Sequence, residues 1–204
     1  MRNKTYEKAV FAHPFTAAYW KCAFGELGSV KTLVLAALFV ALRMAVKALK
    51  IPVGDNLSIF LTFIPNAVGA YLCGPVVGFL SGAVCDTLSF IIAPSGPYNP
   101  AFMFVEALGS FLFALPLYRS RVSAARLFLS RFLVVGVCNL VLTPFFLAVM
   151  YGNKSFAALF STRVVKNVVC YPIESLILCI VFAALVPVMK RAKVCAWIPG
   201  DRLK

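Results

Sequence analysis

The stretch GPVVGFLSGAVCDTLSFIIAPSGPYNP, residues 74–100, decides the fold of this chain. Its first part is an apolar run long enough to cross a lipid bilayer, yet it carries a carboxylate, Asp86, near its middle. The run ends at Pro94, Gly96 and Pro97, and another apolar run follows at once. This pattern predicts two membrane-spanning helices joined by a short, rigid loop.

The whole chain shares this apolar character. Of 204 residues, 62% are hydrophobic and 13% charged, and the mean hydropathy is +0.91, whereas soluble domains are about half apolar and a quarter charged. A window of about 19 residues gives six candidate spans, at residues 32–50, 57–73, 75–93, 99–118, 127–150 and 165–189. We therefore expect an all-α membrane protein with six transmembrane helices in one bundle.

The expected domain organisation is simple. Residues 32–190 form the six-helix transmembrane domain, residues 1–31 a cytoplasmic or interfacial N-terminal extension, and residues 191–204 a basic cytoplasmic tail. The net charge is +13, and thirteen of the 20 lysines and arginines fall in segments on one side of the predicted spans. Because cytoplasmic loops carry an excess of Lys and Arg, both termini are predicted to be cytoplasmic. These cations suit contact with the lipid bilayer, and no nucleic-acid partner is expected.

Six cations on the predicted outer side oppose this bias. They cluster at the end of the first span and in the segment that joins the fifth and sixth spans. At 100° per residue, Lys47 and Lys50 share one helical face with Arg43. Arg43 lies roughly 17 Å from the inner end of its helix, too deep for a lipid-facing guanidinium. The outer cations either anchor headgroups or capture an anionic solute.

The sixth span carries a second polar face. Arg163, Lys166 and Asn167 lie at its outer end, and Glu174 follows about two turns lower on the same side. Tyr171 lies on the Asn167 side of this helix. A glutamate inside a membrane span predicts a functional site, with a structural ion pair to Lys or Arg as the alternative.

Other spans contribute polar groups that do not form a polar helical face of the kind seen in the first and sixth spans. Asp86 is interpreted as a brace for the helix beneath the Pro-Gly loop, with ligand contact as the alternative. Arg131 lies shallow on the inner side, and its side chain is expected to reach the interface. The loop itself carries Tyr98 and Phe102, which are suited to cover a pocket. Glu106 and Asn139 add polar atoms from the fourth and fifth spans.

Several kinds of chemistry have no signature here. The chain lacks a GxxxxGK[ST] phosphate-binding loop and an HExxH zinc motif. Ser81 cannot belong to an intramembrane serine–histidine pair, because the only histidine, His13, precedes the spans. The seven cysteines form no CxxC pair and are interpreted as small packing residues. We expect no enzyme activity, no metal site and no cofactor.

Ala37 and Ala41 lie four residues apart on the first span, opposite the cationic face. Small residues at this spacing allow another helix to approach closely. They predict either a docking face for a partner protein or ordinary packing within the bundle.

Two stretches carry a resemblance to a known family. They are FIPNAVGAYLCGPVVGFLSGAVCDTLSFIIAPSGPYNPAF at residues 63–102 and FLAVMYGNKSFAALFSTRVVKNVVCYPIE at residues 146–174. With six spans and the alanine pair, the chain resembles the substrate-binding S component of an energy-coupling factor vitamin transporter, most closely the folate-specific subfamily. It departs from that subfamily in the CNLVLTPFFL stretch, residues 138–147, which lacks the usual tryptophan.

The resemblance implies a function and a set of partners. It implies a bacterial plasma-membrane subunit that captures folate outside the cell with high affinity and delivers it through an ATP-driven transporter. The partners would be a transmembrane coupling protein, docking on Ala37 and Ala41, and two cytoplasmic ATPases. It also implies the folate contacts. The acceptors for the pterin edge would be Glu174, Asn139 and Asn167, and the rings beside the pterin would be Tyr98, Phe102 and Tyr171. The cations for the glutamate tail would be Arg43, Arg163 and Lys166.

Three alternatives remain at this level. The chain could bind a different vitamin or precursor as an S component. It could be a stand-alone proton-coupled carrier that uses Asp86, Glu106 and Glu174, or a scaffold protein without a ligand.

Overall fold

The computed structural model describes residues 10–11, 13–47, 50–54, 57–92, 98–151, 156–192 and 194. Its elements follow in the order α1 (Ala17–Gly25), η2 (Glu26–Gly28), α2 (Val30–Lys47), β1 (Lys50–Gly54), β2 (Leu57–Phe60), α3 (Phe63–Ile92), α4 (Pro100–Leu117), α5 (Ala124–Leu133), η3 (Val134–Leu142), α6 (Thr143–Tyr151) and α7 (Phe156–Arg191). The described chain is therefore almost entirely helical, as the sequence predicts.

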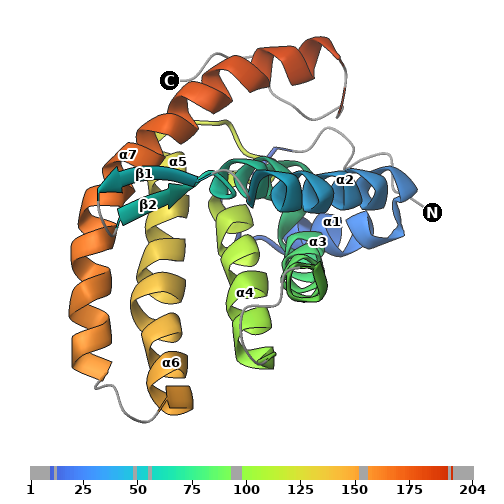
Figure 1. Cartoon of the computed structure of the whole chain (residues 1–204). Coiled ribbons are helices and arrows are strands. Elements are labelled where there is room, and N and C mark those ends of the chain that lie inside the picture. The colour runs from blue at the N-terminus through green and yellow to red at the C-terminus, as the bar shows by residue number, and fades with distance from the viewer. Residues whose placement is uncertain are drawn as a thin grey trace.

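The helices pack around α3. This helix contacts α2, α4 and α1, and α4 in turn contacts the continuous rod made of α5, η3 and α6. Figure 1 shows α4, this rod and the long, curved α7 running in the same general direction, with α1 and α2 at the N-terminal side of the molecule. The core includes Tyr71 of α3, whose ring meets Phe182 of α7 edge-on at 5.7 Å between centroids.

Gly74 breaks α3 into two arms. Its φ of 85° lies in the left-handed region, which residues with a side chain rarely adopt. A Cβ at this position would also lie 2.9 Å from the Tyr118 ring. Pro75 then begins the second arm with a φ that suits a helix. The break expected between residues 73 and 75 is confirmed.

The chain between α2 and α3 differs from the prediction. Residues 57–60 were expected to begin a membrane helix, but they form β2, which pairs antiparallel with β1. Lys50, expected at the end of the first span, pairs with Phe60 in this hairpin. The all-α prediction is therefore wrong for this segment, because hydropathy alone does not separate a strand pair from a helix in a short apolar run.

Four helical segments are long and apolar enough to cross a membrane, and the bent pair formed by residues 17–28 and α2 raises that number to five among the described residues. The predicted spans 99–118 and 127–150 correspond closely to α4 and to the α5–η3–α6 rod. The predicted span 165–189 lies within α7, which begins nine residues earlier. The loop at residues 93–97, part of the expected pocket cover, lies outside the described residues.

The N-terminal extension is attached to the bundle through a buried carboxylate. Glu26 accepts hydrogen bonds from Thr32 Oγ1 at 2.6 Å, the Tyr118 hydroxyl at 3.1 Å and Arg119 Nη2 at 2.8 Å. The ion pair with Glu26 also holds Arg119 in place, although its φ of 48° is unfavourable for a residue with a side chain.

Replacing Glu26 should destabilise the protein strongly. Glu26→Ala leaves the Arg119 guanidinium buried without its carboxylate, a change that costs about 3–5 kcal/mol in comparable ion pairs. Thermal or SDS-induced unfolding of the detergent-solubilised protein measures this loss. Lys21→Ala, an exposed change on the neighbouring α1, is the control and should stay within about 0.5 kcal/mol of the parent protein. Equal stability of the two variants would contradict this account.

Candidate ligand-binding cavity

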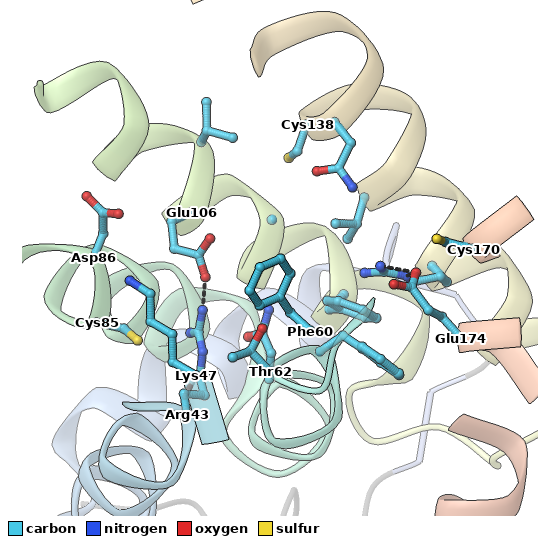
Figure 2. A pocket seen from close by; sticks show the side chains of 18 of the residues that line it. Arg43, Lys47, Phe60, Thr62, Cys85, Asp86, Glu106, Cys138, Cys170 and Glu174 are labelled. Atoms are coloured by element: carbon cyan, nitrogen blue, oxygen red, sulfur yellow. Dashed lines mark hydrogen bonds and ion pairs between the residues drawn. The ribbon is translucent and has the colours of Figure 1, made fainter. Parts of the chain in front are cut away.

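A cavity of about 420 Å³ lies between α2, α3, α4, η3 and α7, and it also touches β2. Cavities of 300–1,000 Å³ with a few polar groups are typical of small-molecule sites. Figure 2 shows Arg43, Lys47, Asp86 and Glu106 on one side, Cys170 and Glu174 on the other, and Phe60 between them. Segments that are far apart in the sequence thus supply the opposite walls.

The floor of the cavity is a buried ion pair on two aromatic rings. Arg131 of α5 donates from Nε to Glu174 Oε2 of α7 at 2.9 Å, and its Nη2 donates to the same oxygen. The guanidinium carbon lies 5.1 Å from the centre of the Phe63 ring and 5.9 Å from that of Phe113. Both partners are less than a tenth exposed. The expectation that Arg131 reaches the membrane interface is therefore wrong.

A hydrogen-bonded network joins three helices along one wall. Arg43 of α2 forms an ion pair with Glu106 of α4 and donates from Nη1 to Ser110 Oγ at 3.2 Å. Ser110 donates in turn to Asn66 Oδ1 of α3 at 2.9 Å. These hydrogen bonds hold Arg43, which is 4% exposed, inside the bundle, as the depth of Arg43 in the first span predicts. They also present the amide of Asn66 to the cavity.

Close approach of α3 and α4 makes this wall possible. A Cβ added at Gly82 would lie 2.7 Å from the Glu106 carbonyl oxygen and 2.8 Å from Ser110 Oγ. No real side chain fits at those distances, so only glycine lets the α4 backbone approach α3 this closely. The small residue thereby sets the position of both Glu106 and Ser110.

Two amides and an irregular helix form the opposite wall. Asn167 donates from Nδ2 to the Arg163 carbonyl at 2.8 Å, and its Oδ1 accepts from Asn139 Nδ2 at 3.3 Å. Asn139 lies on η3, a nine-residue π-helix, a conformation often found at functional sites. Thr143 Oγ1 donates to the Cys138 carbonyl at 2.6 Å and thereby satisfies an acceptor in this irregular stretch.

The rim of the cavity carries three cations that lie outside the ion pairs of the floor and the wall. In the described part of the chain, Lys47, Arg163 and Lys166 form no ion pair, although Lys166 Nζ lies 5.8 Å from the Phe60 ring centre. Asp86 of α3 also lines the cavity, and its carboxylate interacts electrostatically with Lys47 and Arg43 of α2, so its role as a brace stays a prediction. Among the described residues, five cations and three carboxylates line the cavity, which leaves a formal excess of two positive charges.

Most of the residues predicted from polar faces meet at this cavity. They come from three elements and are Arg43, Asn139, Arg163, Lys166, Asn167 and Glu174. The three predicted aromatic contacts do not line it. Tyr98 is 40% exposed beside Phe90, the Tyr171 hydroxyl donates to the Phe128 carbonyl, and Phe102 is only partly buried on α4.

Sequence reasoning missed the aromatic residues that do line the cavity, Phe60, Phe63 and Phe113. Nothing in their local pattern separates them from the other phenylalanines, because ring position depends on neighbouring helices. Asn66 was also missed, although an asparagine after Pro65 inside an apolar run was a usable signal.

The sequence model of the family described as "ECF transporter, substrate-specific component" matches residues 31–182. This chain belongs to that family. S components of this kind are substrate-binding subunits and not enzymes, so the chain is a multi-pass membrane protein of a transport system.

Relatives and a solved structure agree with this assignment. "Folate transporter FolT" from Clostridium novyi is 30% identical over 116 residues, covering 57% of this chain and 67% of the relative. "Folate transporter FolT" from Leuconostoc mesenteroides is 27% identical over 147 residues, covering 69% of this chain and 78% of the relative. A crystal structure of FolT bound with folic acid is similar with a TM-score of 0.63 and 26% identity, over 72% of this chain and 88% of the other.

A methyl group at Gly82 should disturb the cavity wall. Gly82→Ala forces α4 away from α3, and overpacking of this kind costs about 1–3 kcal/mol. Gly136→Ala is the matched control, since no atom lies within 4 Å of its added Cβ. Unfolding of both variants in detergent should show destabilisation for the first only. A Gly82→Ala protein as stable as the control would refute the close contact.

Proposed function

We propose that this S component binds folate in the cavity between α2, α3, α4, η3 and α7. The observation that carries the proposal is the cavity's excess of two positive charges beside an aromatic floor. Folate has a flat pterin, an aromatic linker and a glutamate tail with two carboxylates, so its charge matches that excess. The names of the relatives and of the similar structure support the same ligand.

The pterin occupies the floor and the glutamate tail occupies the rim. Phe63 and Phe113 form the aromatic side of the floor, where they also contact the Arg131 guanidinium. Oε1 of Glu174 accepts no hydrogen bond in the described part of the chain, so it is available for the donor-rich pterin edge, together with the amides of Asn139 and Asn167.

Lys47, Arg163 and Lys166 receive the tail carboxylates, since none of the ion pairs between described residues involves them. Arg43 has a different role from the one its sequence position suggests. Because Glu106 already holds part of its guanidinium, Arg43 fixes the wall of the cavity.

The chain crosses the membrane six times, with both termini in the cytoplasm. The two arms of α3, separated at Gly74, belong to two of these crossings, and α2, α4, the α5–η3–α6 rod and α7 supply the other four. The first arm of α3, residues 63–73, covers about half of the bilayer core, and the segment before it completes that crossing. The excess of Lys and Arg in the segments before α2, between α4 and α5, and after α7 supports this orientation. The cavity rim then faces the outside of the cell.

Transport depends on other subunits. A transmembrane coupling protein docks on the face of α2 that carries Ala37 and Ala41, and two cytoplasmic ATPases supply the energy. Both alanines are exposed and lie away from the cavity lining, which supports a contact face separate from the ligand site.

The decisive experiment is direct. The protein is purified in mild detergent from cells grown with folate, and its ultraviolet spectrum is measured before and after denaturation. A co-purified compound with a pterin spectrum is the expected result. A different bound chromophore, or no folate binding by the purified protein in calorimetry, would overturn the assignment.

Removal of a rim cation should weaken folate binding. Lys166→Ala removes a charged donor, with an expected loss of about 1.5 kcal/mol, which is roughly tenfold in Kd. Lys190→Ala, on the same helix but outside the cavity lining, is the matched control and should bind like the parent protein. Titration calorimetry in detergent compares the two. An equal effect of both changes would argue against a tail site at the rim.

A bulky residue on the docking face should separate binding from uptake. Ala37→Leu fills the surface where a partner helix approaches, so folate binding should persist while uptake falls sharply. Radiolabelled folate uptake in cells that also express the coupling module measures the effect. Ala183→Leu, an exposed alanine on α7, serves as the control. Normal uptake by the Ala37→Leu protein would exclude this face.

A further inference from the structure

The first described helix, α1, lies outside the residues that match the family, yet it is firmly packed. Tyr19, Cys22, Ala23 and Glu26, spaced as one helical face, are all buried. The Tyr19 hydroxyl donates toward the carbonyls of Ala114 and Leu115 at 3.3 Å each. This face therefore fixes α1 against the end of α4.

Aromatic contacts strengthen the attachment. Tyr19 meets the Tyr118 ring edge-on at 5.4 Å between centroids, and Trp20 stacks on Phe111 at 6.1 Å. The backbone N–H of Phe11 donates to the Arg119 carbonyl at 2.7 Å. Together with the Glu26 network, these contacts hold the extension in one position relative to the bundle.

The opposite face of this segment is exposed and has a distinct composition. Phe15 is 93% exposed and Phe24 is 60% exposed. Lys21 of α1 and Lys31 at the start of α2 are also exposed. Between residues 10 and 47 the only carboxylate is Glu26, and it is buried, so this face carries cations and aromatic rings without an exposed acid.

The direction of the segment points to what covers this face. The helix formed by residues 17–28 meets α2 at 81°, so it cannot continue through the bilayer along the axis of α2. Aromatic rings with lysines are typical of helices that lie in the headgroup region of a membrane. The lysines complement anionic headgroups, which attract basic residues near the surface.

We propose that α1 is an interfacial anchor that binds the anionic lipid headgroups of the cytoplasmic leaflet. Phe15 and Phe24 reach the boundary of the acyl chains, and Lys21 and Lys31 contact lipid phosphates. The buried Glu26–Arg119 pair transmits this attachment to the end of α4, so the lipid surface fixes the orientation of the inner end of the bundle. The choice of leaflet rests on the proposed orientation, whereas the depth of α1 does not.

A fluorescent reporter on the exposed face tests the anchor. Phe24→Trp is placed in a protein whose two native tryptophans are changed by Trp20→Phe and Trp197→Phe. The full chain is reconstituted into vesicles of phosphatidylglycerol and phosphatidylcholine whose acyl chains are brominated near the glycerol end or near the methyl end. We expect the shallow bromines to quench about twice as strongly as the deep ones.

A matched reporter calibrates the depth. Leu38→Trp lies midway along α2 and is 62% exposed, so deep bromines should quench it most. Stronger quenching of the Phe24→Trp reporter by deep bromines would overturn the proposal, because α1 would then be buried in the acyl region. Quenching by aqueous acrylamide without any effect of lipid bromines would also overturn it, and would indicate a face reserved for a protein partner.

The charge requirement is tested in the same reporter. Lys21→Glu with Lys31→Glu should reduce shallow quenching in vesicles that contain phosphatidylglycerol and change it little in phosphatidylcholine alone. Equal quenching with and without the lysines would refute binding to anionic headgroups. Folate binding in detergent is measured in parallel, and it should be unchanged in all these variants, so a failure of the anchor is distinguishable from a failure of the proposed ligand site.

Discussion

The need to neutralise charge inside a medium of low polarity governs this structure. An unpaired arginine or glutamate is costly there, so the buried charges must meet partners from other helices. Arg43 meets Glu106, Arg131 meets Glu174, and Arg119 meets Glu26. Each pair joins segments far apart in the sequence. Together the pairs fix the relative positions of α2, α4, α5, α7 and the N-terminal extension.

These ion pairs do not include the cations at the rim of the cavity. Pairing neutralises the floor and one wall, whereas the rim keeps Lys47, Arg163 and Lys166. The S component family supplies the transport context. The proposed orientation of folate, with its acidic end at the rim, rests on this arrangement of cations.

Helical spacing predicted the polar half of the site but not its aromatic half. Arg163, Lys166, Asn167 and Glu174 share one face of a regular helix, so their common position followed from 100° per residue. Tyr171 was misplaced because its hydroxyl bonds the Phe128 carbonyl, a contact that depends on α5. The location of Arg131 depends on Glu174, 43 residues away, which local spacing does not reveal.

The sequence by itself determined the membrane class, the break at Gly74 and which polar side chains share a helical face. Hydropathy, glycine geometry and helical periodicity are local properties, so neighbouring residues reveal them. It could not distinguish the β1–β2 hairpin from a helix end, since both read as short apolar runs. Only the tertiary structure decided which phenylalanines form the floor, which of the described cations form ion pairs and how the N-terminal helix attaches. Each of these depends on close contacts between distant segments, which have no signature in the order of neighbouring residues.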